Sequence, residues 1–544
     1  MKQNVALIGL GKYARYLYLP YMKQENVHLS FVVDLESKKD EVMSYLKNHG
    51  FEEVRFFGIS KSSLNAKHLD KEFATQLKAI CSLLEITHFI VSTEIKAHYR
   101  YIEFALKNKI PTLCDKTLVT SNKNPNRIHT FTTTREYKVL QRIERKTGTN
   151  CYFLNEIEYN PIYDYAKKVL KKFMNQYHIP ITYIDIYECD GEWKMPHEFC
   201  KKSFPGKLFQ NGYSYIYLLS SFLAMNQELP HYKKIVHGSL HSDKLTLKDE
   251  ISCITKEDYK QIFDGQNIPD EYYMKKKFKV KGNCEDNFYS TLNFRNKKNQ
   301  TVTHANINLL HFGLSNRQNM DSEIDYKRNM QEKIHIQLGT LLDMKIISFI
   351  NDEGKEEMEL TIAYNQALLE KKEIEVINSK DIYQNDEDYI VEKPVKEYLS
   401  RFLNKDELNG NLKDHAFAME LLRSSVKSMQ SRFRKTRKIK IPTLEQELTI
   451  ENLRVYSNKT NIDEDKKILH TKIRKMDENV CGVVLNRLKE KKGYEVYYYF
   501  DDGKDVASEL CYRYTKMKWR AEWIYFYYSK IANPKRKLNR LLKK

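Results

Sequence analysis

The chain has 544 residues, 41% of them hydrophobic, with 91 lysines and arginines against 72 aspartates and glutamates. This length and apolar content exclude disorder of the whole chain and predict several domains. No run of 18 apolar residues occurs, so we expect no membrane-spanning helix, and the first residues do not read as a secretory signal. The nine cysteines form no C-x-x-C pair, which indicates a reducing compartment. The sequence therefore predicts a soluble, cytoplasmic protein.

The formal net charge is +19, and basic residues are densest in 432–440 and 530–544. A positive surface of this kind is one property of nucleic-acid-binding proteins. No nucleic-acid-binding motif accompanies either run, and a lysine-rich composition explains both. We therefore interpret them as solvated basic faces and do not expect a nucleic-acid partner.

A glycine-rich turn follows the first apolar run of the chain. The run is Val5–Ile8, and the turn has the pattern G-x-G-x-x-A, followed by a stretch with helical character. In such a turn the first glycine permits a tight bend, the second lets backbone N–H groups approach a pyrophosphate, and the alanine lets helix and strand pack closely. The phosphate would lie at the helix N-terminus. The residues predicted to contact a dinucleotide here are Gly9, Gly11, Lys12, Tyr13 and Ala14.

The next apolar run, Leu29–Val33, ends at Asp34. An acidic residue at this place is suited to bind the adenosine ribose and would repel a 2′-phosphate, which favours NAD over NADP. A helix or turn cap is the alternative role for Asp34. Further apolar runs at 88–93 and 110–114 alternate with helical stretches, which is typical of a doubly wound parallel sheet.

The segment Ser92–Leu118 resembles the Gfo/Idh/MocA family (glucose–fructose oxidoreductase, inositol dehydrogenase and relatives). The likeness includes His98 and the lysine of the family's Glu-Lys-Pro motif, which is Lys116 here, preceded by Asp115 and followed by Thr117. It implies that the cofactor is NAD, with NADP less favoured. The further cofactor contacts that it implies are Ser92, Thr93, His98, Asp115 and Lys116.

The resemblance continues with insertions to about residue 442. It implies an N-terminal Rossmann dinucleotide-binding domain (1–121) and an α+β domain with an open mixed sheet (122–442), which would bind substrate and form homo-oligomers, either dimers or tetramers. Residues 443–544 lie outside it. They predict a small α+β appendix of unknown role, in which Asp477–Lys489 reads as a strand followed by a helix.

In this family a hydride moves between nicotinamide C4 and a carbon that bears a hydroxyl. The resemblance implies that Lys116 hydrogen-bonds the reacting oxygen, whereas the proton goes to a base. At the family's usual aspartate and histidine positions this chain has Gln210 and Ser214, neither of which suits a general base. Tyr217 and His197 are the candidate replacements, and we expect no metal.

Two functions remain open from the sequence. One is an NAD(P)-dependent oxidoreductase acting on a hydroxyl or carbonyl of a sugar, cyclitol or sugar nucleotide. The other is a catalytically altered or inactive relative that binds NAD(H) as a sensor, scaffold or regulatory protein. The residues expected at the cofactor favour the enzyme, and the substitutions at 210 and 214 favour the alternative.

Overall fold

The structure is a computed structural model in which the chain divides into two compact units, Met1–Ile441 and Pro442–Lys544. The described residues are 3–11, 13–115, 130–154, 156–192, 206–230, 233–246, 249, 261, 285–312, 331–350, 356–369, 374–383, 392–406, 408–430, 436–441, 466–476, 479–488, 494–501, 506–515, 522 and 525. Within them, no helix combines the length and the apolar character needed to cross a membrane.

The first unit begins with a six-stranded, fully parallel sheet in the order β3-β2-β1-β4-β5-β6. The strand order reverses at β1, as in doubly wound dinucleotide-binding folds. Because both faces of such a sheet are covered, its central strands are continuously apolar, and Val5 to Ile8 are fully buried. The strands are β1 (Asn4–Ile8), β2 (His28–Leu35), β3 (Arg55–Ile59), β4 (His88–Val91), β5 (Thr112–Cys114) and β6 (Cys151–Phe153).

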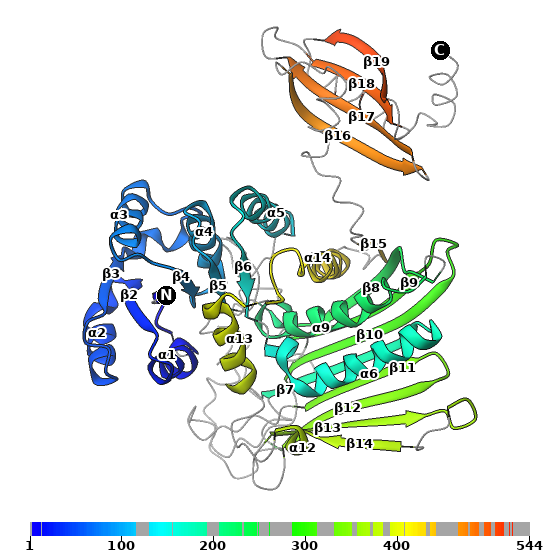
Figure 1. The fold of residues 1–544 in the computed structure, drawn as a ribbon, viewed down its shortest axis with the longest axis horizontal. Coiled ribbons are helices and arrows are strands. Elements are labelled where there is room, and N and C mark those ends of the chain that lie inside the picture. The colour runs from blue at the N-terminus through cyan, green and yellow to red at the C-terminus, as the bar shows by residue number, and fades with distance from the viewer. Residues whose placement is uncertain are drawn as a thin grey trace. The chain divides into compact units, whose positions relative to one another are not determined.

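Helices lie on both sides of this sheet (Figure 1). One of them, α13, comes from far along the chain and packs through Val395, Tyr398 and Phe402 into the apolar core that contains Val5 and Leu7. The helical segments of this region are η1 (Ala14–Tyr18), α1 (Leu19–Gln24), η2 (Glu36–Lys38), α2 (Lys39–Asn48), η3 (Lys61–Asn65), α3 (Lys71–Leu83), α4 (Ile95–Lys107), α5 (Thr130–Thr147) and α13 (Glu392–Asn404).

The second sheet has nine strands in the order β14-β13-β12-β11-β7-β10-β9-β8-β15. Only the central pair, β7 and β10, is parallel, so the sheet is mixed. The strands are β7 (Ile181–Glu192), β8 (His237–Leu245), β9 (Asn287–Arg295), β10 (Thr301–Phe312), β11 (Gln331–Leu338), β12 (Leu342–Ile350), β13 (Glu356–Tyr364), β14 (Ile374–Asn378) and β15 (Arg437–Lys440).

Helices α6, α9 and α14 cover one face of this sheet (Figure 1). The alternation along β11 reflects this, because Ile334, Ile336 and Leu338 are buried while the residues between them are partly or fully exposed. The mixed sheet predicted for the second domain is therefore confirmed. The remaining helical segments are η4 (Glu156–Tyr159), α6 (Pro161–Tyr177), α8 (Lys207–Gln210), α9 (Gly212–Met225), α12 (Ser379–Tyr383) and α14 (Ala416–Gln430).

The second unit contains a four-stranded antiparallel sheet in the order β16-β17-β18-β19. The expected change from strand to helix within Asp477–Lys489 is wrong. Strand β17 continues to Leu488 because it is paired with a neighbour on each side along its length. The strands are β16 (Lys466–Met476), β17 (Asn479–Leu488), β18 (Tyr494–Asp501) and β19 (Val506–Thr515).

Candidate functional site

The turn that follows β1 lies at the point in the sheet where the strand order reverses. Gly9 has φ +90° and donates its backbone N–H to Val33 O at 2.7 Å. A Cβ at this position would lie 2.3 Å from Ser92 O at the end of β4. Only glycine meets both the backbone conformation and the close approach without strain.

Gly11 is a glycine for a different reason. It is exposed, and a Cβ built on it meets no atom within 4 Å, so the space beside it is open. Behind it, Arg15 Nε donates to Leu10 O at 3.1 Å, and Arg15 pairs with Glu41 at 2.6 Å. These contacts brace the turn, and the open space beside Gly11 is where a pyrophosphate could approach the backbone.

The other turn residues differ in their exposure. Ala14 is fully buried at the start of η1, which is consistent with the small residue expected there for close packing. Tyr13 is half-buried and its ring meets Tyr18 edge-on at 5.6 Å. Lys12 lies outside the described residues.

Asp34 stands at the end of β2 beside this turn. Its Oδ2 accepts the backbone N–H of Leu10 at 2.9 Å, and its Oδ1 accepts the N–H of Leu35 at 2.7 Å. Each carboxylate oxygen has two lone pairs, so acceptor capacity remains for ribose hydroxyls. The residue thus acts as a local cap, the alternative role considered for it, and is also positioned to bind a ribose.

Asp115 follows β5 and connects three elements. Its carboxylate accepts hydrogen bonds from Tyr18 and from Ser92 Oγ, and its backbone N–H donates to Val91 O at 2.9 Å. Burial, reinforced by the charge of Asp115, raises the pKa of Tyr18 well above its ordinary value, so Tyr18 remains a donor. Asp115 therefore joins η1 to the carboxyl ends of β4 and β5.

Two further predicted cofactor contacts lie nearby, at the start of α4. His98 is buried and donates from Nε2 to Thr93 O at 2.9 Å, which closes the turn between β4 and α4. Thr93 lies against Gly9, because its Cγ2 is 2.8 Å from the Cβ position of that glycine. Lys116 lies outside the described residues.

A buried ionic cluster occupies the carboxyl ends of β7 and β10. Lys207 Nζ lies 2.7 Å from Glu188 Oε2 and 2.9 Å from Asp190 Oδ2. His311 Nδ1 is 2.9 Å from the same Asp190 oxygen, and Asn211 Nδ2 donates to Asp190 Oδ1. All four charged or titratable side chains of this cluster are at most 2% exposed.

The pKa values of the two carboxyl groups in the cluster are shifted in opposite directions. Burial opposes ionisation of Asp190, but the hydrogen bond with His311 and the charge of Lys207 outweigh it and hold the Asp190 pKa below its ordinary value. Burial raises the pKa of Glu188 well above its ordinary value, against the opposing charge of Lys207. Asp190 is therefore the ionised partner of Lys207 at neutral pH.

The predicted catalytic positions lie close to this cluster in the chain. Ser214 is 3% exposed on α9, and its Oγ has no hydrogen-bond partner among the described residues. Tyr217 is 5% exposed, and its ring lies 4.5 Å from the ring of His415 in a buried aromatic group. The Gln210 side chain and His197 lie outside the described residues.

Sequence reasoning missed the cluster itself: Glu188, Asp190, Lys207 and His311. The only signal for it was two acids spaced i, i+2 near the end of a strand-like run, followed by a lysine next to Gly206. Nothing in the sequence indicates that His311, more than 100 residues later, joins them.

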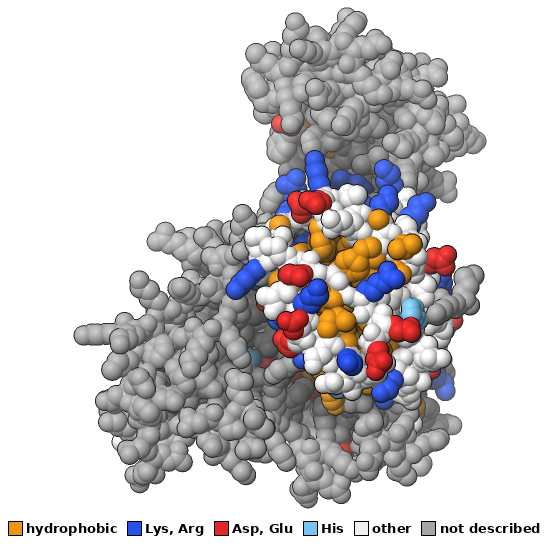
Figure 2. All heavy atoms as spheres, turned by 90° about the vertical axis from the view of Figure 1, so that its left-hand side faces the viewer, with side chains coloured by type: hydrophobic (Ala, Val, Ile, Leu, Met, Phe, Trp, Pro, Cys, Tyr) orange, Lys and Arg blue, Asp and Glu red, His pale blue; other side chains and the backbone are white. Residues whose placement is uncertain are grey.

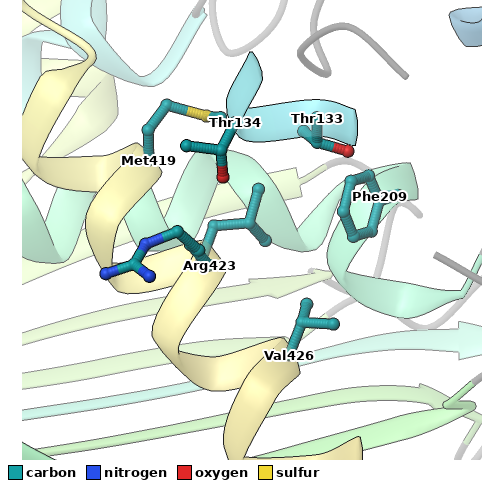
Figure 3. A pocket seen from close by; sticks show the side chains of 7 residues that line it. Thr133, Thr134, Phe209, Met419, Arg423 and Val426 are labelled. Atoms are coloured by element: carbon teal, nitrogen blue, oxygen red, sulfur yellow. The ribbon is translucent and has the colours of Figure 1, made fainter. Parts of the chain in front are cut away.

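One hollow lies between α5, α8 and α14 (Figure 3). Arg423 at its edge donates from Nε to Glu420 at 2.8 Å. The residues that line it are Thr133, Thr134, Phe209, Met419, Leu422, Arg423 and Val426. None of these was predicted as a site residue, so the glycine turn and the ionic cluster are the stronger candidates.

Figure 2 shows the charged side chains on the side of the first unit that carries α2, α3 and β3. Basic and acidic side chains alternate over it, with apolar side chains between them. Such a surface differs from the one-signed patch typical of nucleic-acid-binding proteins.

No protein-family model and no curated protein matches this chain. Solved structures that resemble it include a putative myo-inositol dehydrogenase from Sinorhizobium meliloti (10% identity, 81% of this chain, 100% of that chain, TM-score 0.44). Others are an oxidoreductase from Agrobacterium radiobacter in complex with NAD+, L-tartaric acid and magnesium (12%, 81%, 98%, 0.44) and a super-repressor mutant of Gal80p from Saccharomyces cerevisiae (12%, 80%, 97%, 0.48). At these identities and TM-scores, the likeness carries no argument about this chain.

Proposed function

We propose that this chain is an NAD-dependent oxidoreductase that transfers a hydride to or from a carbon of a sugar, cyclitol or sugar nucleotide. The observation that carries the proposal is the turn at the strand-order reversal. There Gly9 is required by φ +90° and by contact with β4, while the space beside Gly11 is open. A turn with no ligand would need the first glycine but not the second.

The described residues fit the adenosine and pyrophosphate half of a dinucleotide. Gly11 would let backbone N–H groups reach the pyrophosphate, and Asp34 would accept hydrogen bonds from the ribose hydroxyls. A 2′-phosphate would meet the Asp34 carboxylate, which favours NAD over NADP. When bound, the nicotinamide would accept or supply the hydride.

The residues that would act on the substrate are proposed from the chemistry of their side chains. Lys116 would hydrogen-bond the substrate oxygen, since it directly follows Asp115, whose carboxylate is held by Tyr18 and Ser92. Asp115 itself is held at the carboxyl ends of β4 and β5. Tyr217 and His197 remain candidate proton acceptors.

A regulatory or sensor role is the second candidate function, and one observation favours it. On α9, Ser214 is buried at the position where a base was expected, and Tyr217 packs against His415 in the core. A protein that only senses NAD(H) would keep the glycine turn and Asp34 and would need no proton acceptor on α9.

An assay of hydride transfer separates these two functions. The full chain is mixed with NAD+ and, in turn, myo-inositol, D-glucose and UDP-N-acetylglucosamine, and NADH formation is followed by absorbance at 340 nm. The oxidoreductase proposal predicts NADH formation with at least one of these compounds, and none when leucine replaces Gly11. Tight NADH binding without turnover of any compound would instead support the sensor.

We also propose a homo-oligomer built through the face of the second sheet opposite to α6, α9 and α14. Four apolar side chains on that face of β12 and β14 are 37–54% exposed, namely Ile347, Phe349, Ile374 and Val376. Apolar groups that recur on one sheet face are typical of an interface. Light scattering coupled to gel filtration tests this, and a monomer at micromolar concentration would contradict it.

A further inference from the structure

Burial of the cluster formed by Glu188, Asp190, Lys207 and His311 costs free energy, because its charged groups lose their hydration. Desolvation of an ion pair is offset only when the geometry is good, and apolar residues of the same size often stabilise a fold as well or better. The contacts here are short and multiple: Lys207 reaches both carboxylates, and Asp190 is also bound by His311 and Asn211. These contacts hold the Asp190 carboxylate, and through it the imidazole of His311, in one position.

The backbone is shaped to bring the histidine and the aspartate together. The parallel ladder of β7 and β10 is regular up to Cys189 and Leu310 and then slips, so that Phe312 pairs with Glu192. Two residues of β7, Asp190 and Gly191, therefore face the single residue His311. Gly191 has φ +61°, the left-handed conformation that such a bulge uses. Bulges often redirect a side chain beside a functional site.

His311 is also fixed from its other side. Its backbone N–H donates to Asp286 O and to Asn287 Oδ1, both at 3.1 Å. Because the Asp190 carboxylate can only accept, Nδ1 of His311 carries the proton in their 2.9 Å contact. The nitrogen that would exchange a proton with a substrate is therefore Nε2.

The cluster lies next to the helix position where a base was expected. Asn211, which binds Asp190, follows Gln210 in the chain and precedes Ser214 by three residues at the start of α9. Lys207 begins α8, which leads directly into α9. The Asp190–His311 pair thus lies beneath the beginning of α9, although both of its members come from the sheet.

We propose that His311 is the proton donor and acceptor of the site, that Asp190 orients it, and that Lys207 holds Asp190 in place. This rests on the proposed oxidoreductase function. In the reducing direction, the carbonyl carbon of the substrate would gain a hydride, which carries two electrons, and a C–H bond would replace the C=O π bond; a bound reduced nicotinamide would supply that hydride. The carbonyl oxygen takes its proton from His311 Nε2, and a proton from water then restores the imidazolium.

Proton release on cofactor binding tests this without a known substrate. The positive nicotinamide ring of NAD+ should disfavour a protonated His311 close to it, whereas the neutral ring of NADH should not. Calorimetric titrations of the full chain with NAD+ and with NADH, in buffers of different ionisation enthalpy between pH 6 and 8, give the protons released. We expect more protons to be released per chain on binding NAD+ than on binding NADH.

Two histidine variants test whether the released proton comes from His311. His311→Gln should abolish the difference between NAD+ and NADH, whereas the glycine turn, which this variant leaves unchanged, should still bind NADH. His88→Gln is the matched control: His88 is a buried histidine of β4, packed against Phe402, and its replacement should leave the difference unchanged. If His311→Gln fails to fold, Asp190→Asn serves instead and should reduce the difference, because His311 loses its carboxylate partner.

The outcomes are distinct. Loss of the proton difference in His311→Gln alone supports the inference. Equal proton release in the wild type and His311→Gln, or no NAD+-specific release in the wild type, would overturn it while NADH binding stands. Failure of both nucleotides to bind would overturn the proposed function and this inference with it. Glu188 of the cluster, and the titratable groups that face the cluster (Glu285, Asp286, Glu332 and Tyr215), remain present in every variant.

Discussion

The carboxylate of Asp34 accepts the backbone N–H of Leu10 at 2.9 Å, so the end of β2 is bound to the glycine turn that follows β1. We propose that the same carboxylate also binds the ribose of a dinucleotide. On that proposal, one side chain would both shape the turn and favour NAD over NADP.

The first prediction concerns this double role. Asp34→Ala should weaken NADH binding by roughly tenfold, because the ribose hydroxyls lose a charged acceptor. NADPH should be affected less, because the repulsion of its 2′-phosphate is removed at the same time. Dissociation constants for both nucleotides check this, and an equal loss for both would remove Asp34 from the ribose site.

The two glycines of the turn should respond differently to alanine. Gly9→Ala places a methyl group 2.3 Å from Ser92 O at φ +90°, so it should lower the free energy of unfolding by roughly 2–4 kcal/mol. Gly11→Ala meets no atom within 4 Å and should leave stability nearly unchanged. Denaturant melts and NADH titrations of both variants measure this.

Retention of NADH affinity in the Gly11 variants would contradict the assignment of this turn to the pyrophosphate. If Gly11→Ala kept full NADH affinity, and a larger residue such as leucine at this position did so too, the open space beside Gly11 would not be the pyrophosphate site. Gly148 also meets no atom within 4 Å and offers a control for NADH affinity away from the turn, but its φ of +69° strains any substitution, so it is no control for stability.

Glu285 predicts a dependence of stability on pH. Burial raises its pKa to about 7, from an ordinary value near 4.5. The unfolded chain then releases this proton before the folded chain does, so stability falls as pH rises from about 4.5 to 7 and changes no further above that. Glu285→Gln removes this cost and keeps an acceptor for the Leu208 N–H, 3.2 Å from Glu285 Oε1.

The variant should therefore gain more stability at pH 8 than at pH 4, by roughly 2–3 kcal/mol. Chemical denaturation at both pH values checks this. The prediction is contradicted if Glu285→Gln shifts the two free energies of unfolding equally, or destabilises the protein more at pH 8.

Lys116 is predicted to act on the substrate oxygen. Once a substrate is known, Lys116→Ala should lower kcat by about 10²- to 10³-fold and leave the dissociation constant for NADH nearly unchanged. Lys109, which lies at a turn after α4, offers a matched control lysine on the same segment. An unaltered kcat in Lys116→Ala would exclude Lys116 from the chemistry.

The cluster at Lys207 gives a prediction about folding alone. Lys207→Met leaves the Asp190 carboxylate buried without its cation and should cost about 3–5 kcal/mol. Adding Asp190→Asn should recover part of that loss, because the uncompensated charge is removed. Free energies of unfolding for the two variants test this, and no recovery in the double variant would contradict an ionised Asp190.

Much of the fold could be predicted because its signals are local. The apolar runs of β1 and β2, together with Gly9, Gly11 and Asp34, lie within 35 residues and indicate a parallel sheet with a dinucleotide turn. The error in 477–489 has the opposite cause. Alone, this segment is ambiguous, and pairing with β16 and β18 makes it a strand up to Leu488.

The ionic cluster could not be predicted for a related reason. Asp190 and His311 are 121 residues apart in sequence, and only the pairing of β7 with β10 and the bulge at Gly191 bring them together. The burial of Tyr217 beside His415 likewise depends on the packing of α9 near the start of α14. Such contacts between distant elements leave no periodic pattern in the sequence.

We propose that the turn around Gly9, Gly11 and Asp34 binds NAD. A titration of the full chain with NADH and, separately, NADPH, followed by energy transfer from protein aromatic residues to the nicotinamide, tests this directly. We expect saturable binding, with NADH bound at least tenfold more tightly than NADPH. Binding of neither nucleotide, or a preference for NADPH, would contradict it.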